Sequence, residues 1–67
     1  TGANLESANL SGAKLNSADL SRAILTNANL ISAVLISANL SDAILDGVDL
    51  SGASLLFAIM PDGSFID

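Results

Sequence analysis

Residues 21–40 read SRAIL TNANL ISAVL ISANL, four units of five residues that each carry Ala in the third place and Leu in the fifth. The same register extends back to Thr1 and forward to Met60, so twelve units cover residues 1–60. Ala holds the third place in eleven units, and Leu holds the fifth place in eleven. The two exceptions, Val48 and Met60, are also apolar. An internal repeat this strict decides the architecture.

A period of five is incompatible with an amphipathic helix and with a flat strand. Five residues of α-helix turn through roughly 500°, about 140° more than one turn, so the leucines would spread round the helix and form no stripe. The side chains of a strand alternate between two faces, and an odd period would place successive leucines on opposite faces. The pattern therefore predicts a backbone that bends once in every unit.

Each unit divides into a short extended piece and a corner. In Ala3-Asn4-Leu5, an extended backbone points Ala and Leu to one side and Asn to the other. The next two residues turn the corner, and Ser, Asn, Asp and Gly, which favour turns, fill most of these places. Glycine at the second place of four units indicates a backbone that sometimes needs a positive φ. We therefore expect coils stacked about 4.8 Å apart, with leucine inside.

The tandem pattern Ala-(Asn/Asp)-Leu-X-X resembles the pentapeptide-repeat proteins over about nine-tenths of the chain, as in Ala8-Asn9-Leu10, Ala18-Asp19-Leu20 and Ala28-Asn29-Leu30. The resemblance implies an all-β fold, a right-handed quadrilateral β-helix with about three coils of four units. It also implies that Leu or Met is the central inward residue and Ala the second one. That family is abundant in cyanobacteria, and many members, including proteins of the thylakoid lumen, have no assigned activity.

The repeat divides the chain into a β-helix over residues 1–60 and a tail over residues 61–67. Pro61 cannot donate a hydrogen bond to a ladder, and Pro61-Asp62-Gly63 favours a tight turn. We expect Phe65 and Ile66 to fold over the open end of the last coil, because a solenoid end is both apolar and edge-like.

Composition restricts the chemistry that is available. The sequence has no His, Cys, Tyr or Trp, so we expect no enzyme activity, no cofactor and no metal site. Two basic residues, Lys14 and Arg22, stand against seven acidic ones, and a net charge of −5 disfavours nucleic acid and anionic membranes as partners. No apolar run approaches about 20 residues, the length that spans a membrane. We expect a soluble chain in the cytoplasm or, in a cyanobacterium, in the thylakoid lumen or periplasm.

The carboxylates and the outward amides allow two interpretations each. A weak Ca²⁺ site could form among Asp42, Asp46 and Asp49, but the chain lacks the glycine–aspartate turns of calcium-binding solenoids, so solvated corner residues are favoured. The Asn or Asp between Ala and Leu could form a binding ladder. We favour local hydrogen bonds to the backbone, which short polar side chains commonly make.

Outward apolar residues form the candidate interface. Ile24 and Ile44 should stack on one face of the solenoid, and a second group should cluster on another: Ile31, Val34, Ile36, Leu56 and Phe57. A contiguous apolar patch often marks an interface, whereas β-branched residues at a surface can also simply favour extended backbone.

The sequence thus predicts a non-catalytic structural or protein-interaction module. It would bind a protein partner, or associate with itself, through an apolar face or a solenoid end. One alternative is an acidic DNA mimic that binds a type II topoisomerase such as gyrase, as some relatives do. Another alternative is a segment of a larger multidomain protein.

Overall fold

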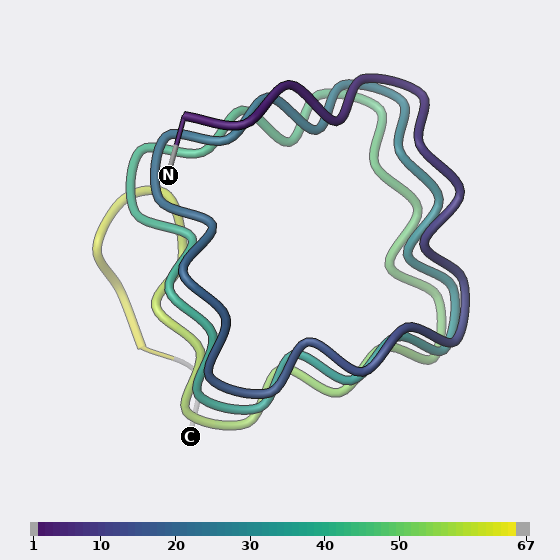
Figure 1. Ribbon diagram of the computed structural model, residues 1–67. Helices are drawn as coiled ribbons and strands as arrows, with labels where there is room; N and C mark the ends of the chain where they lie inside the picture. The colour runs from purple at the N-terminus through teal and green to yellow at the C-terminus, as the bar shows by residue number, and fades with distance from the viewer. Residues whose placement is uncertain (1, 66–67) are drawn as a thin grey trace.

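The computed structural model describes residues 2–65, which wind into three stacked coils (Figure 1). Isolated parallel bridges join residues twenty positions apart, from Asn4 with Ile24 to Asn39 with Ile59. Twenty residues therefore make one coil, which is four units. In Figure 1 the chain runs clockwise from the N-terminus while receding from the viewer, so the coil is right-handed. The Cα trace measures 26 × 22 × 16 Å.

The coil has four sides, each built from the third to fifth places of three stacked units. Side A contains residues 3–5, 23–25 and 43–45; side B residues 8–10, 28–30 and 48–50; side C residues 13–15, 33–35 and 53–55; and side D residues 18–20, 38–40 and 58–60. The two residues between neighbouring sides form the corners. Each side pairs through single bridges, so the described residues contain neither a helix nor a continuous strand.

Backbone hydrogen bonds connect each unit of the middle coil to both neighbouring coils. Leu25, at the fifth place, donates its N–H to Ile44 of the next coil at 2.9 Å, and Asn27, at the second place, donates to Asp46 at 2.8 Å. Ile24, at the fourth place, donates to Ala3 of the preceding coil at 2.8 Å. The same pattern recurs on every side, which satisfies polar groups that would be costly to bury.

Each corner from residues 6–7 to residues 56–57 is a β-turn with one residue in the left-handed region. The N–H of the third place bonds to the C=O of the fifth place before it, as in Ala28 to Leu25 at 2.9 Å. All twelve residues at the second place have a positive φ, including Arg22 (60°), Asn27 (59°) and Phe57 (61°). A positive φ at this position is the mark of a type II turn. The sequence predicted a positive φ only in some units, because only four of these residues are glycine.

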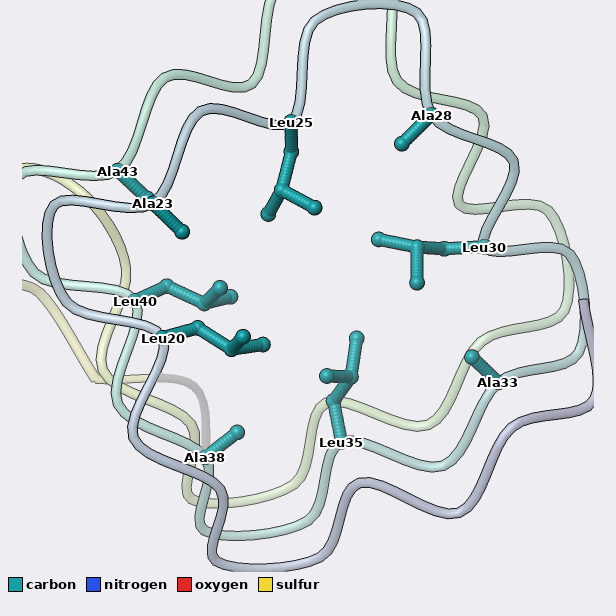
Figure 2. Close-up of a cluster of buried hydrophobic side chains, with 10 residues drawn as sticks. All are labelled: Leu20, Ala23, Leu25, Ala28, Leu30, Ala33, Leu35, Ala38, Leu40 and Ala43. Atoms are coloured by element: carbon teal, nitrogen blue, oxygen red, sulfur yellow. The ribbon is translucent and has the colours of Figure 1, made fainter. Parts of the chain in front are cut away.

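Leucine and alanine fill the interior, as predicted. In Figure 2 the leucines point to the centre of the coil, and the alanines lie beside them against the walls. Leu25, Leu30, Leu35 and Leu40, in the middle coil, are at most 1% exposed. Most leucines of the first and third coils, such as Leu10 and Leu50, are only partly buried, because each of these coils has a neighbour on one side only. Leu20, at the end of the first coil, is the exception at 8% exposed.

The tail does not cover the open end in the way the sequence predicted. Residues 61–65 turn back so that Phe65 forms an antiparallel bridge with Ile59, and Met60 donates its N–H to Ser64 at 2.8 Å. The tail, yellow in Figure 1, therefore runs beside residues 58–60. Phe65 is 70% exposed and does not cover the core, because it sits at a bridge position whose side chain faces outward. Ile66 lies outside the described residues.

Candidate interaction surface

The surface of residues 2–65 repeats the same outward places from coil to coil. This part of the chain contains no pocket and no group of three or more His, Cys, Asp or Glu side chains that could hold a metal ion. It also contains no helix that is long and apolar enough to cross a membrane. The features that could recognise another molecule are therefore outward side chains on a rigid frame.

The outward Asn and Asp side chains are structural, as predicted. Each Oδ1 accepts the backbone N–H of the residue two positions later, as in Asn29 with Ile31 at 3.0 Å. Where that residue is Ser, its hydroxyl donates to the same oxygen, as in Asn39 with Ser41. The acceptors are Asn4, Asn9, Asp19, Asn29, Asn39, Asp49 and, in the tail, Asp62. These bonds fix the first corner residue, whose N–H the coil-to-coil ladder does not use.

Two of these carboxylates have a lowered pKa. Hydrogen bonds from the Ser51 hydroxyl and N–H lower the pKa of Asp49 below its ordinary value of 3.8. Hydrogen bonds from the Ser64 hydroxyl and N–H lower the pKa of Asp62 in the same way. Both side chains are therefore negatively charged near neutral pH.

The structure separates the predicted apolar residues into two groups. Ile24 and Ile44 stack through a parallel bridge on side A, where Ile24 is half-buried and Ile44 is 45% exposed. They form a small aliphatic pair with Asn4 as the third member of the column. This pair lies on the side of the coil opposite side C and is not part of the second group.

The second group gathers around side C and the corner between sides C and D. Val34 lies on side C in the middle coil, half-buried between Ile31 and Ile36 at the two adjacent corners. The next coil places Leu56 and Phe57 against the corner of Ile36, since the N–H of Ser37 bonds to the C=O of Leu56 at 2.9 Å. Leu56 is 46% exposed and Phe57 is 56% exposed.

Two members of this surface, Ile59 and Phe65, were not predicted from the sequence. Ile59 lies on side D, two residues after Phe57, and its bridge to Phe65 brings the tail alongside. The fourth place of the twelfth unit is an outward position, so Ile59 could have been found from the repeat alone. Phe65 could not, because its place depends on the turn of the tail. We call Ile36, Leu56, Phe57, Ile59 and Phe65 the apolar corner.

Phe57 is the exceptional residue of the apolar corner. A bulky side chain at a φ of 61° is an outlier, whereas Gly, Asn or Asp adopts this conformation readily. The ring is more than half exposed, so the core gains little from it. Backbone strain without a compensating burial is a recurring property of functional positions. Both aromatic residues of the chain, Phe57 and Phe65, are exposed at the apolar corner.

Comparison with known proteins decides the family. The family model for pentapeptide repeats, which describes eight copies of the repeat, matches residues 3–42, 13–52 and 28–62. The chain belongs to the pentapeptide-repeat family. The predicted fold, a right-handed β-helix with four units per coil, is therefore confirmed both by the coil itself and by the family.

Two solved pentapeptide-repeat structures illustrate the similarity. A pentapeptide-repeat protein from the thylakoid lumen of Arabidopsis thaliana is 40% identical with a TM-score of 0.84, and the match covers 87% of this chain and 40% of that one. HetL, which is involved in heterocyst differentiation regulation in the cyanobacterium Nostoc sp. strain PCC 7120, is 44% identical with a TM-score of 0.61, over 97% of this chain and 33% of HetL. This pentapeptide-repeat chain thus spans well under half the length of either protein. No curated protein matches it significantly.

Proposed function

We propose that this pentapeptide-repeat chain is a non-catalytic protein-interaction module that contacts its partner through the apolar corner. The single observation that carries the proposal is Phe57, which is held at a strained φ and left more than half exposed. A sequence selected for folding alone would place Gly, Ser or Asn here, as most other units do. Aromatic residues are enriched at interfaces, where they become energetic anchors.

The frame around Phe57 supports this role. The corner is fixed by the hydrogen bond from Ala58 to Leu55 at 2.9 Å and is stacked on the corner of the preceding coil. A side chain on a fixed backbone loses little conformational entropy when it binds, so an exposed ring on this frame is pre-organised for contact. The absence of His and Cys from the sequence removes the commonest general base and the thiol nucleophile, which supports a binding role rather than catalysis.

Site-specific photo-cross-linking tests the proposal. A photoreactive amino acid would replace Leu56 in one sample and Ile44 in a control, and each protein would be irradiated in extract of its native cells. The two positions are matched, because Leu56 is 46% exposed and Ile44 is 45% exposed on a different side. We expect discrete adducts from position 56 and only background from position 44. Equal labelling at the two positions would refute the apolar corner as the contact surface.

The likeness to a protein of the thylakoid lumen supports placing this chain in that compartment. Fractionation of photosynthetic cells, followed by protease protection of intact thylakoids, checks this. A lumenal protein survives protease until the membrane is opened, whereas a cytoplasmic protein is found outside the thylakoid fraction.

A further inference from the structure

We propose that side D, from the apolar corner to the corner of Asp42 and Asp62, binds a segment of a partner protein that carries Arg or Lys among its apolar residues. This inference rests on the interaction function proposed above and adds the chemistry of the partner.

Two exposed aromatic rings supply the first part of the argument. Phe57 stands at one edge of side D, and Phe65 lies over the end of the same side through its bridge to Ile59. Phe65 is 70% exposed, the largest exposed fraction among the large apolar side chains described. The face of a phenyl ring attracts the guanidinium of Arg and the ammonium of Lys as well as apolar groups. Two open rings therefore suit a segment that combines aliphatic side chains with a cation.

Carboxylates at the other edge of side D supply the second part. The N–H of Asp42 bonds to the C=O of Pro61 at 3.1 Å, which stacks the residues of the tail corner on those of the third coil. Asp42 and Asp62 are consequently successive members of one column, and both are exposed. Asp62 also accepts the N–H and hydroxyl of Ser64, which fixes its position beside the bridge of Phe65. A cation bound over the rings therefore finds negative charge along the adjacent edge.

The net charge of the chain favours a basic segment of another protein over a second copy of this chain as the partner. Lys14 is on side C in the first coil, away from the tail. Arg22 adjoins Asp42 in the same column, on the side away from Asp62. Two copies that met through side D would bring a net charge of −5 toward another −5. Electrostatic complementarity instead favours a basic segment and accelerates its encounter.

Selection of short random peptides displayed on phage tests the inference, with the 67-residue chain as bait and the Phe57→Asn variant as counter-selection. We expect the selected peptides to be enriched in Lys and Arg over Asp and Glu, alongside aliphatic residues. Affinity of the best peptide is then measured for Asp42→Asn/Asp62→Asn and for Asp46→Asn/Asp49→Asn. The two double variants change the net charge equally. The control residues lie away from side D, Asp49 on side B and Asp46 at the corner between sides A and B.

The expected result is a loss of roughly fivefold or more in affinity for the side D variant and a loss of less than about twofold for the control. Acidic or uncharged selected peptides, or equal losses in the two double variants, would overturn the inference while leaving the apolar corner intact. Failure to recover any peptide that distinguishes the parent from Phe57→Asn would overturn both proposals. If the molar mass of the chain alone in solution exceeded that of a monomer, the inference of a basic partner would be overturned in favour of self-association.

Discussion

At the scale of single residues, the second place of the repeat explains how one backbone accommodates many side chains. The turn requires a positive φ, and the chain meets this requirement with Gly, Ser, Asn, Asp, Arg and, once, Phe. The cost of the left-handed region is low for Gly, and for Asn because its short polar side chain can hydrogen-bond to the local backbone; it is higher for Ala and Phe. Each substitution at this place therefore changes stability through the backbone conformation and, separately, through packing of the side chain. Phe57 is the position where the two effects are most clearly separable.

Replacing Phe57 by Asn should therefore cost little. We expect the free energy of unfolding to change by less than about 1 kcal/mol, compared with about 3–5 kcal/mol for truncating a buried Phe. Phe57→Ala should be less stable than Phe57→Asn by about 1 kcal/mol, because both variants lose the ring but only Asn tolerates the positive φ. Urea unfolding followed by circular dichroism measures both differences. A loss of several kcal/mol in Phe57→Asn would show that the ring belongs to the core.

Acid should weaken the fold through Asp49 and Asp62. Their folded pKa values lie below the ordinary 3.8, so the ionised carboxylates stabilise the fold above about pH 4, and this contribution is lost as the pH falls through the folded pKa. In Asp49→Asn/Asp62→Asn the amide oxygen still accepts the Ser hydrogen bonds but cannot titrate. We expect the double variant to lose less stability than the parent between pH 5 and pH 2, measured by urea unfolding. Parallel curves for the two proteins would contradict this.

At the scale of the repeat unit, the bond from the fourth place to the next corner is a distinct stabilising element. Asn39→Ala leaves the N–H and hydroxyl of Ser41 without this acceptor, and we expect a loss of about 1 kcal/mol. Asn39→Asp keeps the acceptor and serves as the control, measured at high ionic strength because one of its bridge partners is Asp19. Thermal unfolding of the two variants separates loss of the hydrogen bond from any effect of substitution at this place. Equal losses would mean that the bond contributes nothing.

The contribution of a leucine to the free energy of unfolding should depend on which coil contains it. Leu30 is fully buried in the middle coil, whereas Leu10, directly before it on side B, is only partly buried. We expect Leu30→Ala to lose about 3 kcal/mol and Leu10→Ala less than half of that, because the first coil has no neighbour on its outer side. Urea titrations of both variants provide the comparison. Equal losses would indicate that the end coil is as well covered as the middle one.

The repeat unit was predictable from sequence, and the tail was not. The strict Ala and Leu columns require a bend in every unit and an inward leucine, and both are present. The sequence underestimated the positive φ, because Ser17, Arg22 or Phe57 carries no mark of it in its own chemistry. Phe65 was expected to fold over the open end of the last coil because that end is apolar and edge-like. Its outward position follows from pairing with Ile59 after the turn that ends at Gly63, where the N–H of Gly63 bonds to Met60 at 2.8 Å.

The candidate surface was predictable only in part for the same reason. Repetition fixes which places point outward, so the corner of Ile36, Leu56 and Phe57 could be read from the spacing of twenty once that spacing was known. Ile24 and Ile44 satisfy the same rule, yet they are an isolated pair on another side. The strained φ of Phe57 is what favours the apolar corner over the pair of Ile24 and Ile44 as the contact surface, and this strain exists only in the folded backbone.

At the scale of the whole molecule, the distribution of charge bears on the DNA-mimic alternative. The acidic side chains are spread over several sides and corners: Glu6 and Asp46 lie between sides A and B, Asp49 on side B, Asp19 on side D, and Asp42 with Asp62 between sides D and A. A mimic of duplex DNA needs closely spaced rows of negative charge.

We therefore expect no inhibition of DNA gyrase by this chain. A supercoiling assay, with the chain in large molar excess over the enzyme, measures the outcome. A variant in which Ser11, Asn29 and Ser51 become Asp provides a comparison with more negative charge on and beside side B. Inhibition by the unmodified chain at low excess would revive the alternative and contradict the distribution argument.

Because each coil takes twenty residues, the stacking of coils also determines how folding of the chain begins. The bonds between coils join residues 19 or 21 positions apart, as in Leu5 to Ile24 and Ile24 to Ala3. No isolated coil can form them, so nucleation requires parts of two coils at once and bears the entropy of closing a loop of that length. Once two coils are paired, each added unit forms its hydrogen bonds to a coil that is already folded. During synthesis, a coil that has no earlier coil to pair with would therefore stay unstructured, and each later coil would fold at the pace of synthesis.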